Sequence, residues 1–129
     1  MKKLQFLVCF FSLAVLSCND SDDENYSALE GQWSLVKITA ELGASEISEG
    51  LITYDFNTQQ HTVTIHNNTE LLSPVSGIYT YDIDANPDSE MCEKTIEINS
   101  EGKYCFLLEG SNMSFDLSAV DGQKLDFSR

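Results

Sequence analysis

The chain has 129 residues, of which 21 are acidic and seven are basic, and its formal net charge is −14 at pH 7. A charge of that sign repels nucleic acid, which excludes it as a partner, and makes anionic lipid surfaces poor partners. Cations, basic proteins and neutral ligands remain open. The length suits one small domain with a single hydrophobic core.

The N-terminus has the three parts of a secretory signal peptide. A pair of lysines gives a positive start, an apolar run follows from Leu4 to Leu16, and the small Ser17 precedes Cys18. The run is shorter than the roughly 20 residues of a membrane span, and acidic rather than basic residues follow it. We therefore expect residues 1–17 to be removed. The remaining chain keeps five basic residues against all 21 acidic ones, a formal charge of −16.

The cleavage region carries a second signal. Leu16-Ser17-Cys18 resembles the lipobox of bacterial lipoproteins, which implies that Cys18 is lipidated and anchors the protein to a membrane. Residues 18–28 begin as a polar, acidic stretch and are expected to form a flexible tether. Within them, Ser21-Asp22-Asp23-Glu24 resembles the export signal of Bacteroidetes lipoproteins. This resemblance implies an outer-membrane location facing the cell exterior, with the periplasmic face as the alternative.

From residue 29 onward, apolar residues alternate with polar ones, which is typical of half-buried antiparallel strands. Turn residues such as Asn67-Asn68 and Gly110-Ser111 separate the alternating runs. The pattern predicts an all-β domain, an eight-stranded antiparallel meander barrel, because closure removes exposed sheet edges. A β-sandwich is the alternative. The first strand begins near Trp33, and the others are expected around residues 52–56, 63–65, 79–83, 96–98, 104–108, 113–117 and 125–127.

Three short motifs in these strands are similar to those of lipocalin-like domains. Gly31-Gln32-Trp33 resembles the Gly-x-Trp that opens their first strand. Gly77-Ile78-Tyr79-Thr80-Tyr81 resembles a Gly-x-Tyr-x-Tyr strand of the small lipocalin-like lipoproteins of Bacteroidetes, and residues 121–127 fit their last strand. The resemblance covers residues 29–129 and implies a lipocalin-like barrel there. The chain is shorter than a ligand-carrying lipocalin and lacks the helix that follows the barrel, so the fold is implied more than a ligand.

Large aromatic residues occupy the positions expected to point into the barrel. An eight-stranded barrel is either filled by its own side chains or holds one small ligand. We expect Trp33 to plug one end and a shallow apolar pocket to open at the other, completed by a loop over Thr39 to Gly50 with Ile47 as a lid. The candidate ligand-binding residues are Trp33, Ile47, Tyr54, Tyr79, Tyr81, Tyr104 and Phe115.

Besides the lipidated Cys18, two cysteines remain after export, Cys92 and Cys105, and in an oxidising compartment such a pair predicts a disulfide. His61 and His66 lie five residues apart on an expected strand, so they face opposite sides and do not share a metal. No serine or cysteine stands with a histidine in a recognisable nucleophilic arrangement. We therefore expect a binding protein and not an enzyme, with no metal and no cofactor.

Two functions from different classes fit these expectations. The first is capture of a small apolar ligand at the barrel mouth by a lipid-anchored envelope protein. The second is protein–protein interaction through a filled barrel, as an accessory subunit of a surface complex or as an inhibitor of a basic lysozyme. Ser76-Gly77-Ile78-Tyr79 loosely resembles a Ser-Gly-x-x-Tyr signature of lysozyme-inhibitor lipoproteins, but the basic residue of that signature is missing.

Overall fold

The structure, a computed structural model, describes residues 26–85, 87–88, 90–117 and 122–129. The signal peptide expected over residues 1–17, the lipidated Cys18 and the tether as far as residue 25 lie outside the described residues. In the described part, no helix is long and apolar enough to cross a membrane. The short 3-10 helix η1 (Tyr26–Leu29) precedes the first strand, and the ring of Tyr26 meets that of Phe106 edge-on, with centroids 6.4 Å apart. Tyr26 thus packs against the barrel.

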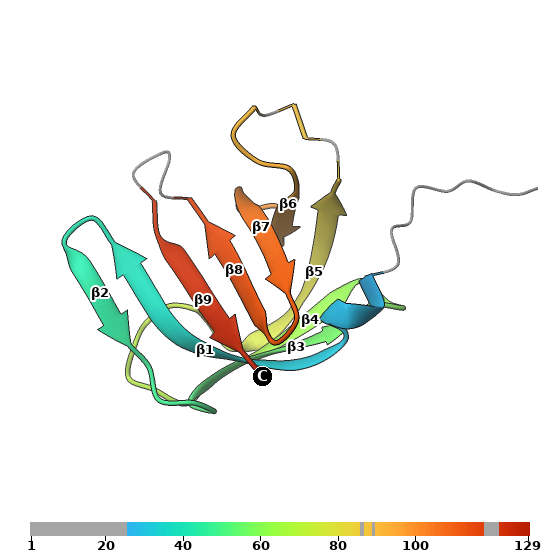
Figure 1. Cartoon of the computed structure of the whole chain (residues 1–129). Coiled ribbons are helices and arrows are strands. Elements are labelled where there is room, and N and C mark those ends of the chain that lie inside the picture. The colour runs from blue at the N-terminus through green and yellow to red at the C-terminus, as the bar shows by residue number, and fades with distance from the viewer. Residues whose placement is uncertain (1–25, 86, 89, 118–121) are drawn as a thin grey trace, which may run out of the picture.

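The described residues form nine antiparallel strands in one sheet. Strand β1 pairs with both β3 and β9, which closes eight of the strands into a barrel (Figure 1). Around the barrel the strands follow chain order, so the predicted eight-stranded meander barrel is confirmed and the β-sandwich is not adopted. The strands are β1 (Gly31–Ala40), β2 (Gly43–Glu46), β3 (Ile52–Asn57), β4 (Thr62–Asn67), β5 (Gly77–Asp84), β6 (Thr95–Ile98), β7 (Lys103–Glu109), β8 (Asn112–Asp116) and β9 (Lys124–Ser128).

Strand β1 is long enough to pair with two partners along one edge. Its first part, residues 31–34, pairs with β3, and its last part, residues 37–40, pairs with β2. A register shift between Leu35 and Lys37 in the β1–β9 ladder marks a bulge, which bends a strand. Because β2 pairs with the last part of β1, these two strands form a hairpin beside the barrel (Figure 1). We expected a loop over Thr39 to Gly50 in its place.

Aromatic side chains fill the barrel interior. The ring of Phe115 lies 4.8 Å from that of Phe127, 6.0 Å from that of Phe106 and 6.2 Å from that of Tyr54, centroid to centroid. Pairs in such tilted and edge-to-face arrangements each contribute roughly 0.5–1.5 kcal/mol beyond their buried area. All the aromatic residues expected to point inward are buried or half-buried, namely Tyr54, Phe56, Tyr79, Tyr81, Tyr104, Phe106, Phe115 and Phe127.

One end of the barrel is closed around Trp33, whose side chain is fully buried. Its indole N–H donates to the carbonyl oxygen of Leu29 at 2.9 Å, and the guanidinium of Arg129 lies over the ring, 4.3 Å from the centroid. Arg129 also donates to the carbonyl oxygen of Glu30 at 2.9 Å. From the β3–β4 turn, Thr58 donates its backbone N–H and its hydroxyl to the Glu30 carboxylate at 2.7 and 2.6 Å. Three distant parts of the chain thus meet at this end.

Cys92 and Cys105 form a disulfide, which confirms the expected pairing. Their Cα atoms are 5.3 Å apart and the two residues are separated by 13 positions. Cys105 lies on β7 between Tyr104 and Phe106, opposite Thr95 of β6. The bond therefore fastens the segment before β6 to the neighbouring strand.

Candidate functional site

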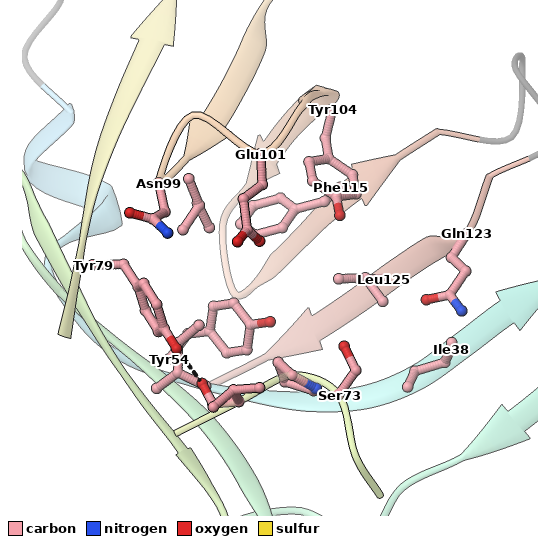
Figure 2. Close-up of a pocket in the computed structure, with 14 residues that line it drawn as sticks. Ile38, Tyr54, Ser73, Tyr79, Asn99, Glu101, Tyr104, Phe115, Gln123 and Leu125 are labelled. Carbon is pink, nitrogen blue, oxygen red and sulfur yellow. Dashed lines mark hydrogen bonds between the residues drawn. The ribbon is translucent and has the colours of Figure 1, made fainter. Parts of the chain in front are cut away.

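A cavity of about 200 Å³ lies at the end of the barrel opposite Trp33 (Figure 2). The β4–β5 connection adds Ser73, Pro74 and Val75 to its rim, the β6–β7 turn adds Asn99 and Glu101, and Gln123 precedes β9. Because each of the eight barrel strands also contributes a side chain, the cavity is a product of barrel closure. The strand residues, in order from β1 and β3 to β9, are Ile38, Tyr54, Ile65, Tyr79, Ile98, Tyr104, Phe115 and Leu125.

The deepest part of the cavity is apolar. Phe115 is 1% exposed and Tyr54 is 4% exposed, so both rings are anchored in the core below the cavity. The ring of Tyr104 lies 5.9 Å from that of Phe115. Ile38 and Leu125 are register partners in the β1–β9 ladder and form one wall. An apolar group that entered the cavity would therefore contact rings on one side and aliphatic side chains on the other.

Hydroxyl groups supply much of the polar lining. Tyr79 donates its hydroxyl to the carbonyl oxygen of Val75 at 2.9 Å, which ties β5 to the β4–β5 connection (Figure 2). Its ring crosses Gly77, where an added β-carbon would lie 3.1 Å from the Tyr79 hydroxyl oxygen. That spacing is tighter than ordinary contact, so the glycine of the Gly-x-Tyr motif makes room for the tyrosine two residues later.

Two phenols of the cavity, those of Tyr54 and Tyr104, have raised pKa values. Burial raises the pKa of the Tyr54 phenol far above its ordinary value, and the nearby phenols of Tyr104 and Tyr79 raise it further. Burial also raises the pKa of Tyr104, with a second contribution from the Glu101 carboxylate. Tyr54 thus lies within electrostatic reach of the phenols of Tyr104 and Tyr79, and Tyr104 lies within reach of the Glu101 carboxylate. The hydroxyls of Tyr54 and Tyr104 stay protonated and can donate hydrogen bonds.

The β6–β7 turn has a backbone conformation that brings polar side chains to the rim. Asn99 and Ser100 have positive φ angles of 54° and 56°, and the N–H of Glu101 donates to the carbonyl oxygen of Ile98 at 3.2 Å. Two central residues with positive φ inside such a hydrogen bond define a type I′ hairpin turn. Outside glycine these angles are uncommon, and they concentrate at functional sites.

Four of the seven sequence-predicted ligand-binding residues line the cavity together: Tyr54, Tyr79, Tyr104 and Phe115. The other three lie elsewhere, and none of them lines it. Trp33 is at the closed end. The ring of Tyr81 stacks on that of His61 at 5.8 Å and meets that of Phe56 at 5.2 Å. Ile47 donates its N–H to Val36 at 2.9 Å and packs against the core.

Sequence reasoning missed the residues on the rim, because they belong to connections. The residues Asn99-Ser100-Glu101-Gly102 are typical of a hairpin turn. No local pattern says that this turn and residues 73–75 meet around the same cavity, since that depends on how the barrel closes. The alternating pattern identifies the strand residues that point into the barrel, but it does not show at which end of the barrel they lie.

Two other features concern metal binding and the outer surface of the barrel. Among the described residues, no three His, Cys, Asp or Glu side chains come together as a metal site requires. A depression of about 490 Å³ also lies on the outer wall beside the disulfide, lined in part by Tyr26, Lys94, Cys105 and Leu107. The barrel thus presents one cavity inside its mouth and a separate surface outside.

Comparisons with known proteins give no relative from which a function can be inferred. No protein-family model, no curated protein and no solved structure matches the chain significantly.

Proposed function

We propose that the protein is a lipid-anchored envelope protein that holds a small, mostly apolar ligand at the open mouth of its barrel. The observation that carries the proposal is the cavity of about 200 Å³, whose floor is aromatic and whose rim is polar, with Ser73, Asn99, Glu101 and Gln123. Small-molecule sites combine apolar walls with polar groups that fix the orientation of the ligand. An apolar cavity of about 150 Å³ takes up benzene, so this one suits a ligand of on the order of ten non-hydrogen atoms.

The site is proposed to bind and not to catalyse. Burial raises the pKa values of the Tyr54 and Tyr104 hydroxyls, so these two groups donate hydrogen bonds and are poor nucleophiles near neutral pH. Floor residues such as Phe115 offer contact area and no reactive group. The ligand is therefore expected to leave chemically unchanged, and no cofactor is required.

Membrane attachment is proposed on the basis of the N-terminal sequence. Leu16-Ser17-Cys18 supports lipidation of Cys18, and the acidic stretch that follows supports export to the outer face of the outer membrane. We expect labelled palmitate to be incorporated into the wild-type protein and not into Cys18→Ser. Added protease should remove the protein from intact cells if it faces outward. Labelling of Cys18→Ser would contradict lipidation at this residue.

Native mass spectrometry of the protein purified from its own envelope tests the ligand proposal. We expect a mass shift from a co-purifying small molecule. The shift should be lost in Leu125→Trp, whose added ring fills the cavity, and retained in Ile78→Trp, an exposed position on β5 outside the cavity. A clean mass for the wild type that stays clean when mixtures of small apolar compounds are added would contradict the proposal.

A second candidate function, protein–protein interaction, has support from the outer wall. The depression of about 490 Å³ lies there, and Leu107 on its edge is 53% exposed. A basic partner such as a lysozyme would complement the net charge of −14. Binding of hen-type lysozyme that weakens steeply with salt would favour this function.

A further inference from the structure

We propose that the mouth of the barrel selects small amines: the ammonium group lies beside the Glu101 carboxylate and the apolar body rests on the rings of Tyr54 and Phe115. This inference rests on the proposed ligand-binding function, and it names the chemical class of the ligand. It draws on the charge of the cavity lining, the position of Glu101 and the aromatic surfaces around it.

Charge at the cavity has one sign. Of the described residues that line it, Glu101 carries a formal charge at neutral pH, and Lys, Arg and His are absent from the lining. Figure 2 shows the Glu101 side chain reaching from the β6–β7 turn into the cavity, with Asn99 beside it and Phe115 next to it. An anionic ligand would meet this carboxylate and no compensating cation. A cationic head group would gain a direct partner.

The position of Glu101 is set by its backbone. The type I′ turn, with positive φ at Asn99 and Ser100, is closed by the hydrogen bond from the Glu101 N–H to Ile98 at 3.2 Å. Glu101 therefore lies at the end of this two-residue turn, two positions before β7 begins at Lys103, and its exposed side chain extends from a defined backbone position. Because the backbone is already fixed there, only the side chain has to be ordered when a ligand binds.

Aromatic faces provide a second reason for an amine. The Tyr104 and Phe115 rings are 5.9 Å apart, and Tyr104 is close enough to Glu101 for the carboxylate to act on its ionisation. A cation near the carboxylate thus also lies near a ring whose face is electron-rich, and cation–π attraction adds to the ion pair. A neutral molecule of the same shape would gain the apolar contact alone.

Three probes of nearly equal shape separate these contributions: benzylamine, benzyl alcohol and benzoate. NMR titration of the full chain in lipid nanodiscs would follow the chemical shifts of the cavity residues. We expect benzylamine to bind about fivefold more tightly than benzyl alcohol, and benzoate to bind most weakly. In Glu101→Gln the preference for benzylamine should fall to less than twofold. Glu41→Gln, which removes an exposed carboxylate outside the cavity, should keep it.

Each outcome decides between the two proposals. If benzyl alcohol and benzylamine bind equally in the wild type, the amine inference is overturned and the ligand-binding function stands. If the preference survives in Glu101→Gln, or is lost equally in Glu41→Gln, the role assigned to Glu101 is wrong. If no probe shifts the cavity residues up to its solubility limit, the proposed binding function fails together with the inference.

Discussion

At the residue scale, Trp33 stabilises the closed end through its size and its indole N–H. The Trp33→Phe variant removes the donor to the buried Leu29 carbonyl oxygen and leaves a space beside the smaller ring. We expect the free energy of unfolding to fall by about 3 kcal/mol, as for other losses of a buried hydrogen bond together with core volume. Urea denaturation measures the change. Arg129→Ala removes the cation stacked on the ring and should cost less, about 1 kcal/mol; the reverse order would contradict this account.

Glu30 gives a pH-dependent prediction at the same end. The hydroxyl of Thr58, and after it the Thr58 backbone N–H, hold the pKa of the Glu30 carboxyl below its ordinary value. A lowered folded-state pKa stabilises the protein above the unfolded pKa, and this stabilisation is lost as the pH falls through the folded pKa. In Thr58→Val we expect the Glu30 pKa to rise toward its ordinary value, as followed by carbon NMR titration. Thr58→Ser should keep it low, and an unchanged pKa in Thr58→Val would refute the role of the hydroxyl.

At the scale of the elements, the disulfide restrains the segment before β6. In the chain-entropy description, closing a loop with a separation of 13 residues stabilises the folded state by about 3 kcal/mol. Replacing both Cys92 and Cys105 with serine should lower the free energy of unfolding by that amount in urea titrations. A reductant should destabilise the wild type and leave the double variant unchanged. Neither cysteine lines the mouth cavity, so ligand binding by the folded double variant should be preserved.

Strand β2 shows which elements the sequence pattern could not predict. All four of its residues, Gly43–Glu46, are exposed, so no apolar alternation marks them. Each of the eight barrel strands buries at least one apolar residue in the core, which is why alternation located them. Strand β1 continues to Ala40, past the expected start of the loop at Thr39, because residues 37–40 pair with β2. An element that covers no core therefore leaves no hydrophobic signal to detect.

At the scale of the whole molecule, barrel closure decides where the functional residues meet. Ile38 and Leu125 are distant in the sequence and become register partners because β1 pairs with β9. The alternating pattern correctly predicted that Tyr54, Tyr104 and Phe115 point inward, but the distribution of inward residues between a closed and an open end depends on strand order and stagger. For the same reason the sequence left two roles open for Trp33, a plug at one end and a lining residue of the pocket, and the structure places it at the end opposite the cavity.

Net charge is the other property of the whole molecule, and it predicts how salt acts on stability. With 21 acidic and seven basic residues, repulsion opposes the compact state at low ionic strength. The Debye length falls to about 10 Å at 0.1 M salt, so we expect added NaCl to raise the free energy of unfolding by on the order of 1 kcal/mol. Circular dichroism in urea at low and moderate NaCl measures the effect.

A charge-reduced variant tests whether repulsion is the cause. Changing the exposed Glu41, Glu49 and Glu70 to glutamine should raise stability at low salt and shrink the response to NaCl. Changing the exposed Gln32, Gln59 and Gln60 to asparagine alters as many surface side chains without altering charge, so the salt response should stay that of the wild type. If salt instead lowers stability, attraction between paired charges outweighs repulsion between the carboxylates.

The negative potential that lowers stability also attracts cations to the barrel mouth. Added salt should therefore raise the free energy of unfolding and weaken amine binding over the same range of concentration.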